Sequence, residues 1–84
     1  MRLDFSPRAA DHLNYWLRTD RKIARKIDPL IEATLSNPFW GIGKPEPLKH
    51  ELSGCWSRRI DKEHRLVYKV EGDTLVILSC RYHY

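Results

Sequence analysis

A carboxylate, a histidine and a set of arginines are the residues of this chain best suited to catalysis. Glu46 lies in a rigid Pro-Glu-Pro segment, and His83 is the penultimate residue. A histidine titrates near neutral pH, so it can give or take a proton. With the arginines, these groups could cut RNA without a metal ion. A base takes the 2′-hydroxyl proton, a cation stabilises the charge on phosphorus, and an acid protonates the leaving 5′-oxygen.

From the residues alone, this arrangement is one of several. His12 and His64 could equally supply the acid, although His12 lies in an expected helix and fits an ordinary surface or packing residue. The sequence has no Gly-rich phosphate loop, no Ser-His-Asp signature and no HExxH motif, and its four histidines are scattered without the spacing of metal ligands. We therefore expect neither a metal nor a cofactor.

The second half of the chain mixes basic and aromatic residues. Basic groups hold phosphates and aromatic rings stack on bases, so the mixture is typical of proteins that bind single-stranded RNA. The same pattern fits a sheet with a charged solvent face and aromatic core residues. The net charge of +4 favours an anionic partner. The residues concerned are Lys44, Lys49, Arg58, Arg59, Lys62, Arg65, Lys69 and Arg81, with Trp56, Tyr68, Tyr82 and Tyr84.

Two arginines in this half become neighbours if the turn between their strands has three residues. A turn at 61–63 would place Arg59 opposite Arg65. Like charges directly opposite each other destabilise a sheet, so a bound anion would make such a pair tolerable. A shift of one residue in register would send the two side chains to opposite faces.

Two helices and a sheet are expected to position these residues. Residues 2–5 read as a strand. Ser6 as N-cap and Pro7 at the first helical position begin a helix, and Asp20 caps a second one. Pro29 lies inside the second apolar stripe, which keeps its phase beyond it, so we expect a kink rather than an end.

The remaining chain reads as a loop followed by strands. Residues 37–50 hold three prolines and two glycines and indicate a long loop. Strands are expected at 55–60, 65–70 and 74–80, and the short turns between them make them antiparallel. The prediction is a single α+β domain, residues 1–84, with two N-terminal helices packed on one face of a mainly antiparallel sheet.

The chain carries no sign of export or membrane insertion. No apolar run approaches the length of a membrane span, and the N-terminus lacks a signal peptide, so we expect a cytoplasmic protein. Cys55 and Cys80 match no zinc or redox motif, and a disulfide is not expected in a reducing compartment.

Several uncommon strings occur together in order. They are Gly-Lys-Pro-Glu-Pro-Leu-Lys-His at 43–50, Leu-Ser-Gly at 52–54, Trp-Ser-Arg-Arg-Ile at 56–60, Glu-His-Arg-Leu-Val-Tyr at 63–68 and Cys-Arg-Tyr-His-Tyr at 80–84. In these strings and in its length, the chain resembles the YoeB/Txe toxins of the RelE superfamily. The N-terminal helices match more loosely, and Pro29 and Cys55 depart from the pattern.

The resemblance implies a RelE-like, microbial-ribonuclease-like fold. It implies a toxin of a type II toxin–antitoxin system that enters the ribosomal A site, cleaves mRNA there and so inhibits translation. It also implies a cognate YefM/Axe-type antitoxin whose flexible C-terminal part covers the site, and it is compatible with a homodimer.

The resemblance also assigns roles to individual residues. Glu46 becomes the general base, His83 the general acid and Arg65 the group that stabilises the transition state. Tyr84 helps to hold the phosphate and the reacting nucleotides. The other residues expected to contact RNA are Lys49, Arg59, His50, Arg58 and Arg81.

Two other classes of function compete with the enzyme. One is a basic domain that binds RNA, or that joins an antitoxin on DNA, without catalysis; the other is an interaction protein whose basic face is only solvated. The set Glu46, Arg65 and His83 favours the enzyme, because a binding protein needs no acid and base. A general acid must be held in place, so we also expect residues 81–84 to continue the sheet or dock on it, with Tyr82 facing the core.

Overall fold

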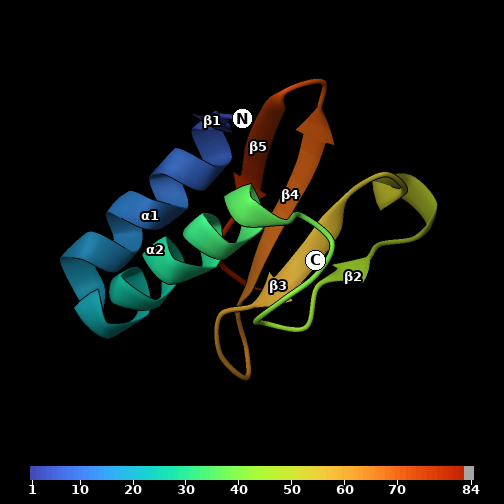
Figure 1. Cartoon of the computed structure of the whole chain (residues 1–84). Helices are drawn as coiled ribbons and strands as arrows, with labels where there is room; N and C mark the ends of the chain where they lie inside the picture. The colour runs from blue at the N-terminus through green and yellow to red at the C-terminus, as the bar shows by residue number, and fades with distance from the viewer. Residues whose placement is uncertain (83–84) are drawn as a thin grey trace.

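The computed structural model describes residues 1–82 and places two helices against a five-stranded sheet (Figure 1). The strand order is β1-β5-β4-β3-β2, with β1 parallel to β5 and the other neighbours antiparallel. The expected α+β architecture is therefore confirmed. The elements in chain order are β1 (Arg2–Phe5), α1 (Pro7–Thr19), α2 (Arg21–Ser36), β2 (Glu46–Pro47), the 3-10 helix η1 (His50–Leu52), β3 (Trp56–Arg59), β4 (Arg65–Glu71) and β5 (Thr74–Ser79).

Both helices begin at the caps that the sequence predicts. The Ser6 hydroxyl accepts a hydrogen bond from the N–H of Ala9, and an Asp20 carboxylate oxygen accepts one from the N–H of Lys22, each at 3.1 Å. These side chains satisfy backbone donors that the first turn of a helix leaves free. Pro29 does not end α2, which continues to Ser36.

The core lies between the helices and the inner face of the sheet. Apolar residues at helical spacing meet alternate residues of the central strands β4 and β5. The buried members of this core are Ala9, Trp16, Ala24, Ile27, Leu30, Ile31, Ile60, Leu66, Tyr68, Leu75, Ile77 and Cys80. Cys55 and Cys80 are both free thiols, and burial raises the pKa of Cys80 to about 12.

Two strands pair in ways that the sequence did not predict. β1 runs parallel to β5, with Leu3 opposite Leu75, although more than seventy residues separate them. β2 lies within the segment expected to be an irregular loop, and it adds an edge to the sheet by pairing with β3. That edge pairing fixes Glu46 to the sheet.

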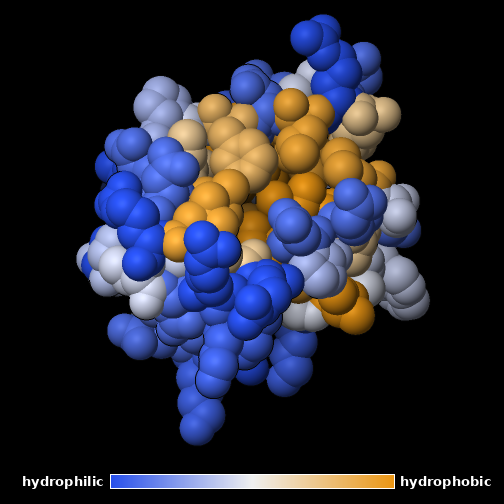
Figure 2. Space-filling model, turned by 90° about the vertical axis from the view of Figure 1, so that its left-hand side faces the viewer, coloured by the Kyte–Doolittle hydropathy of each residue, from blue (hydrophilic) through white to orange (hydrophobic). Residues whose placement is uncertain are grey.

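The helical side of the molecule carries an apolar patch. Figure 2 shows it as a hollowed orange area framed by hydrophilic side chains. An apolar patch with a polar rim is typical of a surface that contacts another protein. Within residues 1–82, no helix is both long and apolar enough to cross a membrane.

Candidate functional site

The sheet register gathers three of the expected site residues on one face. Side chains alternate between faces along a strand, and paired residues share a face. Glu46 pairs with Ser57, and Ser57 pairs with Val67. Arg59 and Arg65 lie two residues further along β3 and β4, so they share the face of Glu46. This face is turned away from the helices, because the alternate residues of β4 form the core.

The same register gives the spacing of the proposed base and cation. Strands lie about 4.8 Å apart and residues about 3.3 Å apart along a strand, which puts the Cα atoms of Glu46 and Arg65 roughly 12 Å apart. Arg59 lies between them on β3, the strand between β2 and β4. Extended glutamate and arginine side chains can both reach one phosphate across such a gap.

The segment carrying Glu46 is held in an unusual conformation. Lys44 and His50, on either side of it, have φ angles of 51° and 59°, a left-handed conformation that costs energy for residues other than glycine. Pro45 and Pro47 flank Glu46 directly and restrict its backbone. Strain of this kind often accompanies a functional site.

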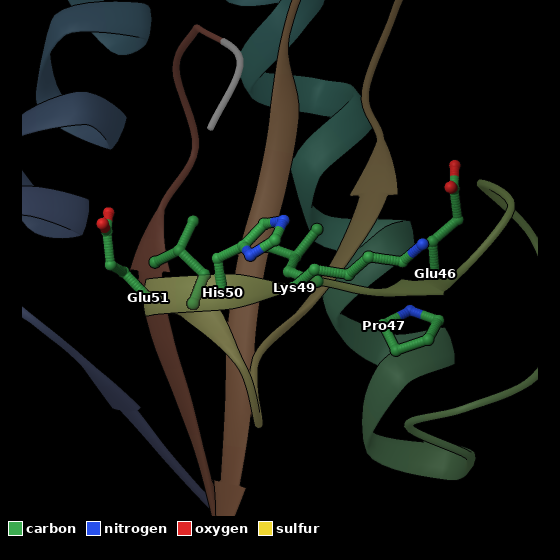
Figure 3. Close-up of a pocket in the computed structure, with 7 residues that line it drawn as sticks. Glu46, Pro47, Lys49, His50 and Glu51 are labelled. Atoms are coloured by element: carbon green, nitrogen blue, oxygen red, sulfur yellow. The ribbon is translucent and has the colours of Figure 1, made fainter.

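A hollow of about 400 Å³ runs along residues 46–52. Glu46 and Glu51 stand at its opposite ends, and the side chain of Lys49 extends toward Glu46 (Figure 3). His50 also lines this hollow. The segment therefore brings together three of the residues expected to act on RNA, namely Glu46, Lys49 and His50.

Arg59 and Arg65 are cross-strand neighbours, as the three-residue turn predicts. The Arg65 guanidinium donates to the carbonyls of Asp61 and His64, at 3.1 and 3.2 Å. Within residues 1–82, neither arginine has a carboxylate within 4 Å. Two uncompensated positive charges thus lie side by side on the face that carries Glu46, an arrangement suited to holding an anion.

Arg58 lies elsewhere, and the expectation that it contacts RNA needs correction. Its side chain is 0% exposed and points to the opposite face from Arg59. The guanidinium donates to the Tyr68 hydroxyl at 3.2 Å and to the carbonyls of Asn37, Trp40 and Ile42. Alternation along β3 explains the difference, since adjacent residues cannot share a face. Arg58 therefore anchors the loop that follows α2.

The guanidinium of Arg81 packs against aromatic rings. Its guanidinium lies 3.6 Å from the ring centroid of Tyr15 and 4.4 Å from that of Tyr82, at cation–π distance. Tyr82 is 51% exposed, so the expectation that it faces the core is wrong. The strand ends at Ser79, and the chain then docks beside the sheet, with the Arg65 N–H donating to the Tyr82 carbonyl at 3.0 Å. His83 and Tyr84 lie outside the described residues.

The two alternative histidines accept backbone hydrogen bonds. Nδ1 of His12 accepts from the N–H of Cys80, and Nδ1 of His64 accepts from the N–H of Tyr82. Nothing in the sequence pattern indicates that His12 and His64 bond to the backbone of residues 80–82. In the part of the chain that the structure covers, no group of three or more histidine, cysteine or acidic side chains could hold a metal ion.

Comparison with known proteins identifies the family. The sequence matches, over residues 5–84, the family described as the YoeB-like toxin of bacterial type II toxin–antitoxin systems. It is 57% identical to Toxin YoeB of Escherichia coli strain K12, over 100% of both chains. The YoeB/ParE toxin from Agrobacterium tumefaciens has a TM-score of 0.96 at 45% identity, again over 100% of both chains.

Staphylococcus aureus YoeB is similar over 100% of this chain and 98% of its own, at 45% identity. It has been solved as a dimer and as a heterotetrameric complex with YefM, with TM-scores of 0.91 and 0.90. These matches span the sequence strings, the helices and the sheet alike. The chain belongs to the YoeB-like toxins of bacterial type II toxin–antitoxin systems.

Proposed function

We propose that this toxin is an endoribonuclease that cleaves mRNA in the A site of translating ribosomes by acid–base chemistry. The observation that carries the proposal is the shared sheet face of Glu46, Arg59 and Arg65, which puts a base and two arginines with no carboxylate partner among residues 1–82 on adjacent strands. A protein that only binds RNA has no need for a carboxylate among its phosphate-binding cations. The site of action would be the cytoplasm, where the ribosomes are.

In the proposed reaction, the nucleophile and the leaving group both belong to the RNA. Glu46 takes the proton from a ribose 2′-hydroxyl, and the 2′-oxygen attacks the adjacent phosphorus. The bond from phosphorus to the 5′-oxygen breaks, and His83 protonates that oxygen. The products are a 2′,3′-cyclic phosphate and a 5′-hydroxyl. Arg65 stabilises the negative charge that builds up on the phosphate in the transition state.

The remaining residues hold the substrate. Lys49 lies beside Glu46 in the hollow and can neutralise a phosphate there, with His50 next to it. Arg59 provides a second positive charge beside Arg65. The proposed role of Tyr84, stacking on a nucleotide or fixing the imidazole of His83, rests on the family resemblance.

Toeprinting on translating ribosomes tests this proposal. The wild type should produce a new stop within the A-site codon, and Glu46→Gln should reduce the cleavage rate by on the order of 10²–10⁴-fold. Glu51→Gln is the matched control, because it removes the same charge from the other end of the hollow. Equal losses in both variants would point to electrostatics in place of base catalysis. Full cleavage by Glu46→Gln would contradict the assignment.

We also propose a protein partner, a YefM/Axe-type antitoxin that is acidic and partly disordered. The YoeB–YefM complexes from Staphylococcus aureus support it. The charge of +4 and the apolar patch on the helical side offer complementary surfaces for such a chain (Figure 2). Its association rate should fall as salt rises. A homodimer, as seen for the Staphylococcus aureus relative, is proposed as well.

A further inference from the structure

Histidines fasten the three residues that follow β5. The N–H of Cys80 donates to Nδ1 of His12 at 3.1 Å, and the N–H of Tyr82 donates to Nδ1 of His64 at 2.7 Å. His12 comes from α1 and His64 from the turn before β4. Two distant parts of the fold thus hold one short segment, 80–82, which leads into His83.

These contacts fix the protonation state of both imidazoles. A backbone N–H can only donate, so the ring nitrogen facing it must present a lone pair. Each imidazole is therefore neutral, with its proton on Nε2. In His64, Nε2 lies 3.6 Å from a carboxylate oxygen of Glu63, which favours a proton there. Protonation of Nδ1 would set one N–H against another and break the bond to the segment.

The segment is hydrogen-bonded to the backbone of Arg65, whose side chain is the proposed cation. The Tyr82 carbonyl accepts a hydrogen bond from the N–H of Arg65 at 3.0 Å, next to His64 in the chain. Tyr82 has a φ of 68°, a strained conformation that must be held by its surroundings. His64 is 7% exposed and packs against Trp16, with ring centroids 4.7 Å apart, so its own position is fixed.

We propose that His64 is a positioning residue, which in its neutral form holds Tyr82, the residue before His83 in the chain, beside the backbone of Arg65, and that His12 holds the same segment at Cys80. The inference rests on the proposed function, in which His83 is the general acid. Misplacing a reacting group by 1 Å can reduce a rate by about 10²-fold.

Charged side chains surround both histidines. The pKa of His12 is lowered, first by burial and then by Arg8 and Arg81, while Asp11 acts the other way. Arg81 also lies over the Trp16 ring that packs on His64. Among residues 1–82, the charged groups around His64 include Asp61 and Glu63 in its own turn, Arg65 on β4 and Arg81 after β5, and Lys26 of α2 acts on Asp61.

Amide hydrogen exchange by NMR on the full chain tests the fastening without any activity. Protection of the Tyr82 amide, corrected for the intrinsic rate, should be lower in His64→Leu than in the wild type, because leucine cannot accept the bond from that amide. The Ile77 amide, in the middle of β5 between two strands, should stay protected and serves as the internal control. His64→Asn, whose amide oxygen accepts the same bond, should keep the protection that the wild type has at Tyr82. Wild-type protection at Tyr82 in folded His64→Leu would overturn the proposal.

Single-turnover cleavage on ribosomes tests the link to the reaction. His64→Leu should lower the rate on the order of 10²-fold with little change in KM, since it releases Tyr82, the residue before the proposed acid, without removing an RNA contact. His64→Asn, which can accept the same bond, should keep the wild-type rate. A wild-type rate in folded His64→Leu would refute the positioning role and leave the proposed function intact. Absence of cleavage by the wild type would instead refute the proposed function. Protection of the Tyr82 amide would still show whether His64 holds the segment.

Discussion

Arg58→Met should destabilise the toxin strongly. Methionine keeps an unbranched apolar stem but removes every donor, so the Tyr68 hydroxyl and three loop carbonyls lose the hydrogen bond that they accept from Arg58. Hydrogen bonds to a charged group contribute about 1.5–3 kcal/mol each. The carbonyls belong to exposed or partly exposed loop positions and can bind water instead, so we expect a net loss of roughly 3–5 kcal/mol. A domain of 84 residues has about 4–13 kcal/mol in total.

Urea unfolding followed by tryptophan fluorescence measures this loss. Arg59→Met is the matched control, because Arg59 is the next residue on β3 and lies on the exposed face. Its unfolding free energy should stay within about 0.5 kcal/mol of the wild type, while its RNA cleavage falls. If Arg58→Met keeps wild-type stability and loses cleavage, Arg58 acts on RNA directly and does not anchor the loop.

Three further outcomes follow from packing and burial. Gly43→Ala should cost about 1–3 kcal/mol in urea unfolding, because a Cβ would meet Leu30 at 2.9 Å and the φ is +81°. Iodoacetamide, followed by mass spectrometry, should modify Cys55 well before Cys80, whose pKa burial raises to about 12. Burial and nearby arginines lower the pKa of His12 below its ordinary value of 6.5. The contribution of His12 to stability should therefore be complete above pH 6.5 and fall as the pH drops below that value. Melting temperatures measured across this pH range test the prediction.

Local signals in the sequence predicted the helices and the central strands well. Ser6 and Asp20 cap the helices as expected, because an N-cap acts through the next three residues of its own chain. The Arg59–Arg65 pair followed from the length of one turn. The Pro-Glu-Pro segment indicated rigidity around Glu46. It did not indicate β2, since a two-residue edge strand with a proline has almost no pattern of its own.

Long-range contacts account for what the sequence could not predict. The parallel pairing of β1 with β5 depends on how the helices return the chain to the sheet. Tyr82 was expected to face the core because residues 81–84 were expected to continue the sheet or dock on it, but the strand stops at Ser79 and the backbone turns. The bonds of His12 and His64 to the final segment depend on that turn. For Arg58, the alternation of β3 would have shown that it and Arg59 lie on opposite faces.

In the proposed mechanism the mRNA supplies its own nucleophile, with Glu46 as base and His83 as acid. A programmed ribosome whose A-site codon carries a 2′-deoxy nucleotide at the position that the toxin cleaves lacks this nucleophile. We expect no cleavage of this mRNA, normal cleavage of the all-ribose control, and products of the control that bear a 5′-hydroxyl. Cleavage of the deoxy-substituted mRNA at the same bond, or products with a 5′-phosphate, would contradict this mechanism.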